Sequence, residues 1–382
     1  MKVSTNVFKF YAWSCVAGFY FMFTLQAIQP LSKGISMPEL ALFVGLTAMA
    51  TTALEVPTGL LADRWSRKLA VSFGFASEGI GFAGYAFVES FWSLLPIAAF
   101  LAVGRSLKSG AAEAMIFEDL DSTGHARDYL AVTSRASSLR NVSGVPAAVA
   151  GPVLYVLAEP APFLLSALAS FIAALIVCTF DERRGGSARQ EVQIMDGLRT
   201  ILRSRALVLL ASIEILVLVF VNTYYQVLFF PRLTSLGLEV EFLGFIDVVM
   251  LGLSSVVLLG LTRLTTTNAK LDLIAYTAVT AGTFVVFAVC PFLGAALVFG
   301  VLFDLAWTAR SHVLPVLSIQ YFESSKRALG LSSLSFVGNL GAAVLVPAAA
   351  AVFIWSYWYS VAPLALILGL LILLAVSDPN QR

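Results

Sequence analysis

The sequence predicts an all-α integral membrane protein with 12 transmembrane helices in two pseudo-symmetric six-helix bundles. Of the 382 residues, 59% are hydrophobic and 12% are charged, whereas soluble domains contain about 25% charged residues. Apolar stretches of membrane-spanning length recur along the whole chain, and short motifs from the first half return in the second. Together these observations indicate a protein whose solvent is lipid.

The apolar segments are long enough to cross a bilayer, since a spanning helix needs about 20 apolar residues. The expected spans are 7–30, 38–62, 69–89, 92–120, 129–154, 160–180, 206–230, 240–262, 271–290, 292–321, 328–350 and 352–376. The connections are mostly short, so neighbouring helices are expected to pack as hairpins.

Positive charges indicate the orientation of these spans. With the N-terminus inside, the outer connections contain only Lys33 and Arg232, and the other basic loop residues fall on the cytoplasmic side. We therefore expect both termini to be cytoplasmic and the chain to lie in the plasma (inner) membrane. The first apolar segment lacks a small-residue cleavage site, so we do not expect it to be a signal peptide.

A polar, basic segment, Asp181–Arg205, divides the spans into six and six. The expected domains are 1–182 and 206–382, joined by a cytoplasmic linker, 183–205. Helical spacing of apolar residues in the linker predicts a short amphipathic helix on the inner membrane surface. Its apolar residues are Val192, Met195, Leu198, Ile201 and Leu202.

The two halves share motifs in the same order. Arg105-Ser106 aligns with Arg310-Ser311, and Ser137-Ser138-Leu139 aligns with Ser332-Ser333-Leu334. Repeated halves that flank a site near the membrane midplane are common in secondary transporters.

The connection between the second and third expected spans carries the most specific motif. It reads Gly59-Leu60-Leu61-Ala62-Asp63-Arg64-Trp65-Ser66-Arg67-Lys68. This segment resembles the pattern G-x-L-A-D-R-x-G-R-K of the major facilitator superfamily, with Ser66 in place of the usual glycine. The resemblance extends over nearly the whole chain and is nearest to the 12-helix drug/proton antiporter branch. It implies a two-bundle fold and transport.

Two further motifs match that branch in part. Arg105-Ser106-Leu107-Lys108-Ser109-Gly110 resembles R-x-x-Q-G, but Lys108 replaces the glutamine and the glycine comes one residue late. Gly151-Pro152 falls where antiporters carry G-x-x-x-G-P-x-x-G-G, but the trailing glycines are missing. The resemblance therefore favours proton antiport and export.

The same resemblance implies a latch that holds the cytoplasmic side closed. Glu55, Gly59 and Asp63 share one helix face; Gly59 would let the eleventh helix approach, and Asp63 would interact with the start of that helix, near Ser324 or Ser325. Arg67 would reach Glu118 or Asp119. The expected latch residues are Glu55, Gly59, Asp63, Arg64, Arg67, Lys68, Glu118 and Asp119. The alternative is that these are solvated loop charges that set the topology.

Several charges lie inside apolar segments, where each costs at least about 2.5–3.5 kcal/mol at mid-bilayer. Such groups are expected to face the bundle interior, to pair, or to line water. The family fold implies that Arg105 and Arg310 face one another across the cavity, with Lys108 one turn from Arg105, and that they attract a carboxylate or phosphate. The alternative is that Glu113 and Asp304 neutralise the two arginines.

Glu113 is the first candidate for the proton carrier and Asp304 the second, because desolvation and a nearby arginine act on a carboxyl group in opposite directions. Asn222 and Gln226 are candidates to line the cavity, since buried amides need partners. Glu55 is left with two alternative partners, Lys108 and Arg140. The expected substrate and proton-coupling residues are Arg105, Lys108, Glu113, Asn222, Gln226, Asp304 and Arg310.

Motifs of other classes are missing. The sequence contains no G-x-x-x-x-G-K-[ST] loop, no H-E-x-x-H and no G-x-S-x-G, so we expect neither an ATP-driven pump nor an enzyme. The scattered Cys15, Cys178 and Cys290 predict no disulfide or metal site, and we expect no cofactor. The net charge of +1 gives no nucleic-acid signal.

The leading hypothesis is a proton-coupled antiporter that exports a small amphipathic organic molecule, drug-like or an anionic metabolite, by alternating access. The alternative is a proton-linked importer of an organic anion such as a carboxylate or siderophore, and a non-transporting receptor is a third possibility. We expect a monomer whose partners are a small-molecule substrate, protons and the lipid bilayer.

Overall fold

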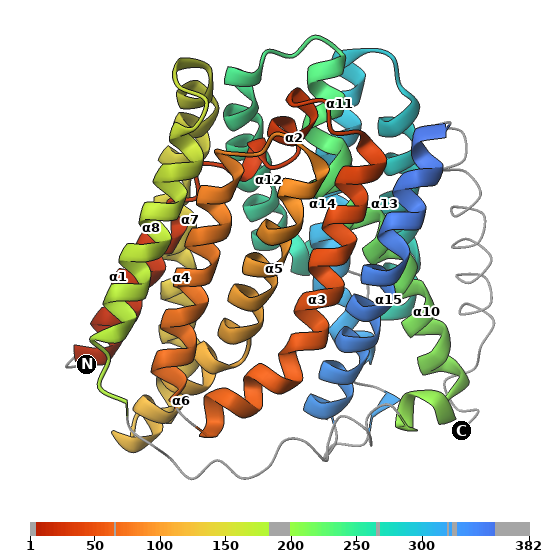
Figure 1. Ribbon diagram of the computed structural model, residues 1–382. Helices are drawn as coiled ribbons and strands as arrows, with labels where there is room; N and C mark the ends of the chain where they lie inside the picture. The colour runs from red at the N-terminus through yellow and green to blue at the C-terminus, as the bar shows by residue number, and fades with distance from the viewer. Residues whose placement is uncertain are drawn as a thin grey trace. The chain divides into compact units, whose positions relative to one another are not determined.

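The chain folds into helices that form two compact units. The computed structural model describes residues 5–64, 66–182, 199–264, 268–318, 321–322 and 327–355, and these ranges contain no strand (Figure 1). Within them, eight helical stretches are long and apolar enough to cross a membrane. The first unit comprises residues up to Ser187 together with Glu239–Val248, and the second comprises the remainder.

The first unit contains the first six expected spans, two of which are broken. Its helices are α1 (Thr5–Gly18), η1 (Phe23–Leu25), α2 (Ile28–Ser32), α3 (Met37–Arg64), α4 (Arg67–Tyr85), α5 (Phe91–Lys108), α6 (Ala111–Ser122), η2 (Ala126–Asp128), α7 (Tyr129–Leu157) and α8 (Ala161–Cys178). The expected span 7–30 is divided among α1, η1 and α2, and the expected span 92–120 is divided between α5 and α6. The unit also contains η4 (Val240–Phe242), which packs against α7, and the start of α12 (Leu243–Leu264).

The break between α5 and α6 follows directly after Lys108. Gly110 has φ +71°, a conformation that residues with a Cβ adopt only with strain. Arg105 and Lys108 therefore occupy the last turn of α5, and Glu113 occupies the first turn of α6. Each charge is stabilised by the partial charge of its helix end.

Glycines bring α4 and α5 together at the level of the buried charges. A Cβ added to Gly104 would lie 2.7 Å from the carbonyl oxygen of Gly74 and 2.6 Å from Cγ of Glu78. Small residues of this kind let membrane helices approach backbone to backbone. The close approach places the side chains of α4 and α5 within direct reach of each other.

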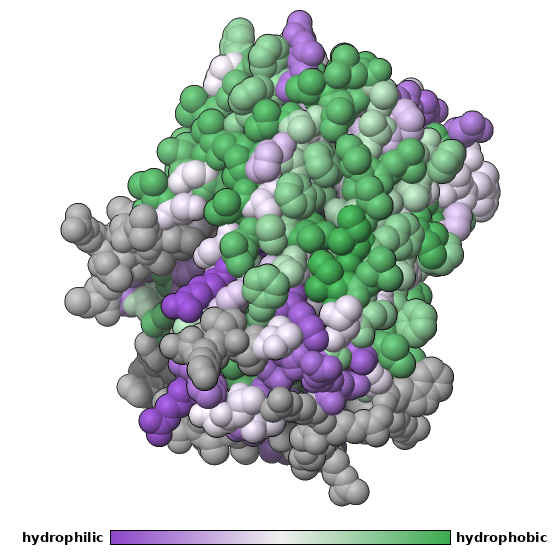
Figure 2. All heavy atoms as spheres, turned by 90° about the vertical axis from the view of Figure 1, so that its left-hand side faces the viewer, coloured by the Kyte–Doolittle hydropathy of each residue, from purple (hydrophilic) through white to green (hydrophobic). Residues whose placement is uncertain are grey.

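Helix α8 separates a buried stripe from a lipid-facing stripe. Phe163, Ala167, Ser170 and Ala174 are buried, whereas Leu164, Leu168, Phe171 and Leu175 are exposed. Both sets recur at helical spacing. Figure 2 shows hydrophobic residues over the middle of the face on this side, with most hydrophilic residues gathered toward its ends. Such a surface is suited to hydrocarbon.

The second unit is built around buried aromatic rings. Its helices are α10 (Arg205–Thr223), the π-helical turn η3 (Tyr224–Leu228), α11 (Phe229–Ser235), the remainder of α12, α13 (Ala269–Val289), α14 (Leu293–Ser318) and α15 (Arg327–Trp355). The rings of Tyr224 and Phe303 lie 4.0 Å apart, and those of Phe220 and Phe284 lie 4.7 Å apart. These contacts join α10 and η3 to α13 and α14.

Some sequence predictions fall wholly or partly outside the described residues. Most of the expected amphipathic linker helix does so, although residues 199–203 are helical. The twelfth expected span, 352–376, does so beyond Trp355. Helix α15 continues to Trp355, past the predicted end of the eleventh span at residue 350.

Candidate functional site

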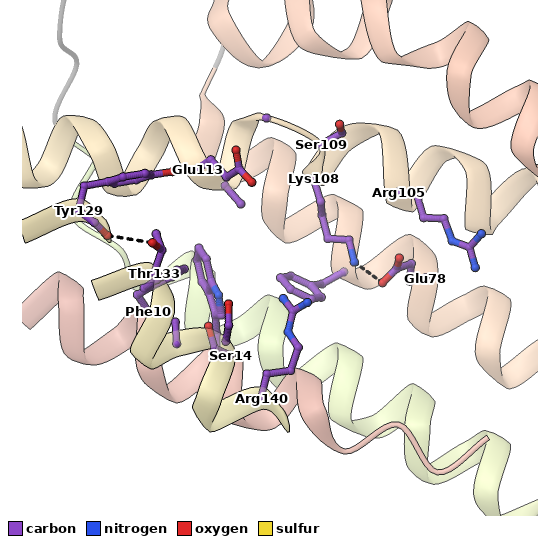
Figure 3. A pocket seen from close by; sticks show the side chains of 16 residues that line it. Phe10, Ser14, Glu78, Arg105, Lys108, Ser109, Glu113, Tyr129, Thr133 and Arg140 are labelled. Carbon is purple, nitrogen blue, oxygen red and sulfur yellow. Dashed lines mark hydrogen bonds and ion pairs between the residues drawn. The ribbon is translucent and has the colours of Figure 1, made fainter. Parts of the chain in front are cut away.

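A cavity of about 560 Å³ lies inside the first unit (Figure 3). Its walls come from α1, α4, the α5–α6 break, the start of α6 and α7. An adjoining hollow of about 220 Å³ shares Glu78, Arg105, Lys108 and Arg140 with it. The sequence-predicted residues Arg105, Lys108 and Glu113 all line the larger cavity.

Lys108 is the one cation of the cavity wall with an acidic partner among the described residues. Its Nζ forms an ion pair with Glu78 of α4 and lies 4.3 Å from the centre of the Phe75 ring. The pairing settles an alternative that the sequence left open, because the partner of Lys108 is Glu78 and not Glu55. Desolvation makes such a partner necessary, since an unpaired buried ammonium is costly.

Arg105 and Arg140 line the same cavity without forming an ion pair to any described residue. Arg140 reaches from α7 toward the Glu78–Lys108 pair (Figure 3). Three cations, Arg105, Lys108 and Arg140, therefore stand against two acids, Glu78 and Glu113. A guanidinium in such a place can bind a carboxylate or phosphate with two parallel hydrogen bonds.

Glu113 is exposed to the cavity and pairs with no described cation. The alternative in which Glu113 neutralises Arg105 is therefore wrong for the described residues. Glu113 belongs to the first turn of α6, beyond the Gly110 break, while Arg105 lies before that break on α5. The change of helix direction separates the two side chains.

Aromatic rings form the apolar part of the cavity wall. Phe10 and Trp13 of α1 meet edge to face with centroids 5.2 Å apart, and Trp13 lies 6.2 Å from Phe75. Tyr129 at the start of α7 continues this wall. Aromatic rings together with guanidinium groups that pair with no described acid suit a ligand that is partly apolar and partly anionic.

Arg310 is fully buried in the second unit and has an acidic partner that sequence reasoning missed. Its Nη2 lies 2.6 Å from Oε2 of Glu214 in α10, and its Nε donates to Oγ1 of Thr277 at 3.1 Å. The alternative in which Asp304 neutralises Arg310 is therefore wrong. A buried arginine requires a counter-charge, and an acid inside the α10 segment was the available signal.

Asp304 is held by hydroxyl groups and forms no ion pair with a described residue. Tyr225 of the π-helical turn and Ser254 of α12 each donate a hydrogen bond to its carboxylate. π-Helical turns occur frequently at functional sites. This turn directs Tyr225 toward α14.

The amide side chains of Asn222 and Gln226 satisfy each other. Gln226 Nε2 donates to Asn222 Oδ1 at 2.7 Å, and Asn222 Nδ2 donates to the carbonyl of Leu218 at 2.8 Å. Both residues remain half-buried. The predicted need of buried amides for partners is thus met within one helix.

The expected latch is described in part. Arg67 forms an ion pair with Glu118 near the end of α6, and the neighbouring Asp119, which is 2% exposed, accepts a hydrogen bond of 2.6 Å from Asn6. The side chains of Asp63 and Arg64, like Ser324 and Ser325 at the expected start of the eleventh helix, lie outside the described residues.

Three further latch candidates, Gly59, Glu55 and Lys68, lie among the described residues of the first unit. Gly59 lies on α3, and its approach to the eleventh helix, which belongs to the second unit, stays a prediction. The adjacent Thr58 donates a hydrogen bond to the carbonyl of Ser106 at 3.1 Å, which joins α3 to α5. Glu55 and Lys68 form no side-chain ion pair with a described residue.

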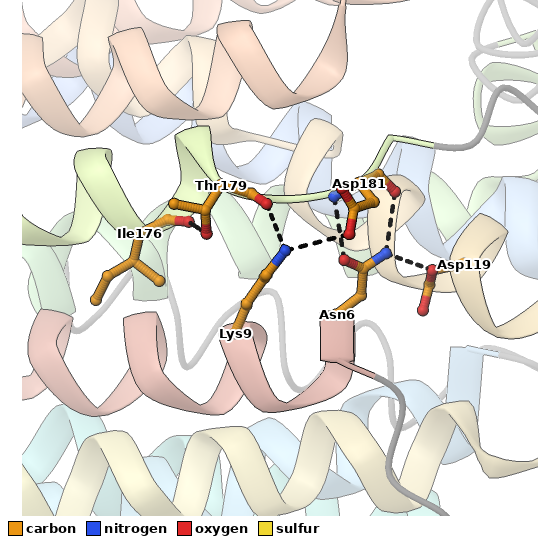
Figure 4. A network of polar contacts seen from close by, with 6 residues as sticks. All are labelled: Asn6, Lys9, Asp119, Ile176, Thr179 and Asp181. Atoms are coloured by element: carbon orange, nitrogen blue, oxygen red, sulfur yellow. Dashed lines mark hydrogen bonds and ion pairs between the residues drawn. The ribbon is translucent and has the colours of Figure 1, made fainter.

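A second set of contacts, near Arg67 at the start of α4, was not predicted from the sequence. Glu182 accepts hydrogen bonds from Ser66 Oγ at 2.5 Å and from the backbone N–H of Arg67 at 2.6 Å, so it caps the start of α4. Figure 4 shows Asn6 and Lys9 bound to Asp181. The acidic pair Asp181-Glu182 immediately after a span was the available signal, because helix N-termini favour negative charge.

These features define a multi-pass membrane protein with a charged internal cavity, the class to which transporters belong. The profile of the Major Facilitator Superfamily matches residues 8–314. The chain therefore belongs to the Major Facilitator Superfamily and is a transporter by family. No curated protein matches the sequence.

Solved structures share the fold at low sequence identity. The nucleoside transporter NupG superposes with a TM-score of 0.79 at 10% identity, covering 98% of this chain and 100% of that chain. A bacterial homologue of the human lysosomal transporter Spinster, inward-facing and occupied, gives 0.74 at 14% identity, covering 98% and 97%. A POT family transporter in complex with 5-aminolevulinic acid gives 0.66 at 12% identity, covering 98% and 96%.

Proposed function

We propose that this protein is a proton-coupled antiporter that exports a small amphipathic organic anion by alternating access. The observation that carries the proposal is the cavity of about 560 Å³ in which Arg105 and Arg140 lack an acidic partner among the described residues. Charged groups inside a membrane protein pair, line water or bind substrate. Two guanidinium groups that form no ion pair with a described residue, beside Phe10 and Trp13, fit an anionic head and an apolar body.

The proton-coupling role rests on two carboxyl groups. Glu113 opens onto the cavity, and Asp304 is held by Tyr225 and Ser254 without an ion-pair partner among the described residues. A carboxyl group in a partly desolvated cavity can change protonation when the substrate or the solvent accessibility changes. Glu113 is the first candidate because the cavity gives it access to both water and substrate.

Alternating access requires contacts that break when the cytoplasmic side opens. Arg67–Glu118 is a candidate contact of this kind, and Asp63 with the start of the eleventh helix is a second. Arg67 and Asp63 both belong to the segment that resembles the family motif. The proposal assigns the latch role to this segment and to the inner end of α6.

The proposal places the protein in the plasma membrane as a monomer with both termini in the cytoplasm. The bias of Lys and Arg toward one set of connections supports this orientation. To test this orientation, a cysteine is introduced at either terminus of the protein, and intact cells are treated with a membrane-impermeant fluorescent thiol label. Labelling from outside would contradict the orientation.

The transport test uses proteoliposomes with an imposed pH gradient and the pH dye pyranine inside. Aromatic carboxylates and aryl phosphates are compared with their neutral amides and alcohols. We expect the acidic compounds to move protons through the protein and the neutral ones to have no effect. Transport at a rate that does not depend on the pH gradient would contradict proton coupling. The direction of substrate movement relative to that of protons distinguishes antiport from proton-linked import.

Arginine variants test the substrate site. Arg105→Ala and Arg140→Ala should each weaken the apparent affinity for an acidic substrate by about tenfold or more, because a hydrogen bond to a charged group contributes about 1.5–3 kcal/mol. Arg135→Ala is the matched control, since Arg135 lies on α7 with Arg140 but does not line the cavity. Unchanged affinity in both test variants would reassign the arginines to structural roles.

A further inference from the structure

The dipeptide Asp181-Glu182 connects three helix ends of the first unit. It follows α8 directly, and residue 183 begins the segment that leads along the chain to the second unit. Its partners lie at the starts of α1 and α4 and, through Asn6, at the end of α6. The two residues immediately before the linker are therefore bonded to the helix ends that carry the latch candidates.

Glu182 is bonded to the first turn of α4. Its two carboxylate oxygens accept from Ser66 Oγ at 2.5 Å, from Arg67 N–H at 2.6 Å and from Lys68 N–H at 3.4 Å. The first N–H groups of a helix have no partner within the helix, and a carboxylate satisfies them while opposing the positive helix end. The contact fixes the backbone from which Arg67 reaches Glu118.

Asp181 is bonded to α1 through both its backbone and its side chain (Figure 4). Its N–H donates to Asn6 Oδ1 at 3.1 Å, and its carbonyl accepts from Asn6 Nδ2 at 3.0 Å. Its carboxylate lies 3.3 Å from Lys9 Nζ. Asn6 Nδ2 also donates to Asp119 at 2.6 Å, so one amide links Asp181 to a buried latch candidate.

We propose that Asp181 and Glu182 are positioning residues of the transport cycle, which hold the chain immediately before the linker on the first bundle and thereby fix Arg67 and Asp119 in their latch geometry. This inference rests on the latch role proposed above. Loss of the Glu182 carboxylate frees the start of α4, and the cytoplasmic side then opens more readily. A movement that pulls on the linker acts on the same bonds.

A cysteine reporter in the cavity tests this without a substrate or a proton gradient. Ser109 lines the cavity and is exposed, so Ser109→Cys is introduced after Cys15, Cys178 and Cys290 are replaced by serine. Its reaction with a membrane-impermeant thiol reagent is measured from each side of oriented vesicles. We expect Glu182→Ala to raise the ratio of cytoplasmic to external labelling about tenfold, the factor for a contact of ~1.4 kcal/mol.

Three further variants make the result specific. Glu182→Gln keeps an acceptor oxygen but not the charge and should give an intermediate ratio, and it also serves if Glu182→Ala does not fold. Asn6→Ala should raise the ratio because it releases Asp181 and Asp119 together. Asp121→Asn removes an exposed acid of α6 that has no side-chain partner among the described residues, so its ratio should equal that of the parent.

A parent-like ratio in both Glu182 variants overturns the inference, and so does an equal shift in Asp121→Asn, which would indicate a general charge effect. A merely structural role for Glu182 would lower the melting temperature without changing the ratio of labelling between the two sides. Because no transported substrate is used, failure of this test leaves the proposed transport function intact. Failure of the vesicle transport assay likewise leaves the labelling result readable.

Discussion

Glu78 of α4 and Lys108 of α5 form an ion pair beside the point where Gly74 and Gly104 bring the two helix backbones together. The side chains are 10% and 21% exposed, and both line the cavity of the first bundle. Because Glu78 and Lys108 neutralise each other, neither adds to the net charge of the cavity. Arg105 and Arg140 then remain as the groups able to bind an anion.

Removing one member of the Glu78–Lys108 pair should lower the free energy of unfolding, because the other charge is then left without a partner. Glu78→Gln and Lys108→Met should each destabilise the protein by about 2–3 kcal/mol, somewhat less than the 3–5 kcal/mol of a fully buried pair. The double variant should lose less than the sum, because neither charge is then left unpaired. Equilibrium unfolding in mixed detergent micelles measures this cycle, and strictly additive losses would show that the two side chains do not interact.

The close approach of α4 and α5 should tolerate no added methyl group. Gly104→Ala would bring a Cβ to 2.7 Å from the carbonyl oxygen of Gly74, and overpacking of this kind costs about 1–3 kcal/mol. Gly282→Ala in α13 is the control, since a Cβ there meets no atom within 4 Å. That control should be neutral or slightly stabilising. Equal melting temperatures for the two variants would contradict the contact.

The sequence predicts the helical spans and the candidate cavity charges because lipid imposes both. Every apolar segment of the required length up to residue 350 coincides with a helix or a run of helices in the described ranges. Charges within such segments had to face inward, and Arg105, Lys108 and Glu113 do line the cavity. These predictions depend on composition and local spacing, which a single sequence contains.

Pairing between helices could not be predicted in the same way. Glu214 and not Asp304 neutralises Arg310, because the partner depends on how α10 and α14 are rotated about their axes. The contacts of Asp181 and Glu182 depend likewise on where α8 ends relative to α1 and α4. Composition and spacing in one helix do not fix the rotation of its neighbour.

The buried partner of Arg310 should matter more for folding than the nearby Asp304. Glu214→Gln leaves the fully buried guanidinium without its counter-charge, which costs about 3–5 kcal/mol. Asp304→Asn keeps an oxygen for Tyr225 and Ser254 and should cost less than about 1.5 kcal/mol. The apparent melting temperatures in detergent should therefore rank wild type, Asp304→Asn and Glu214→Gln in falling order. The reverse order of the two variants would show that Asp304 carries the structural charge.

The ion pair between Lys33 and Glu159, in the first unit, should make the stability of the protein depend on pH. Lys33 Nζ lies 2.5 Å from Glu159 Oε1, and this hydrogen bond, followed by that from Gln29, lowers the pKa of Glu159. A group whose pKa is lower in the folded protein stabilises it above the unfolded pKa of about 4.3 and loses that effect as pH falls through the folded pKa. Melting temperatures between pH 7 and pH 3 should therefore fall less in Glu159→Gln than in wild type.

High salt should diminish the same pH dependence, because both side chains are partly exposed and their interaction is screened. The hydrogen bond to Glu159 also raises the pKa of Lys33. Its contribution is complete below the unfolded lysine pKa of about 10.4 and is lost as pH rises through the folded value. Parallel acid curves for Glu159→Gln and wild type would show that the pair contributes nothing measurable.

Proton coupling should fail when Glu113 is neutralised and should survive the same change at Asp304. Glu113 opens onto the cavity, so water and substrate both reach it, whereas Asp304 is enclosed by the hydroxyl groups of Tyr225 and Ser254. Glu113→Gln should abolish substrate-driven proton movement in pyranine-loaded vesicles, and exchange of labelled for unlabelled substrate without a gradient should continue. Asp304→Asn should retain at least half of the proton movement. The opposite pattern would move the proton-carrying group to the second bundle, because the enclosed carboxyl group would then be the one that changes protonation during the cycle.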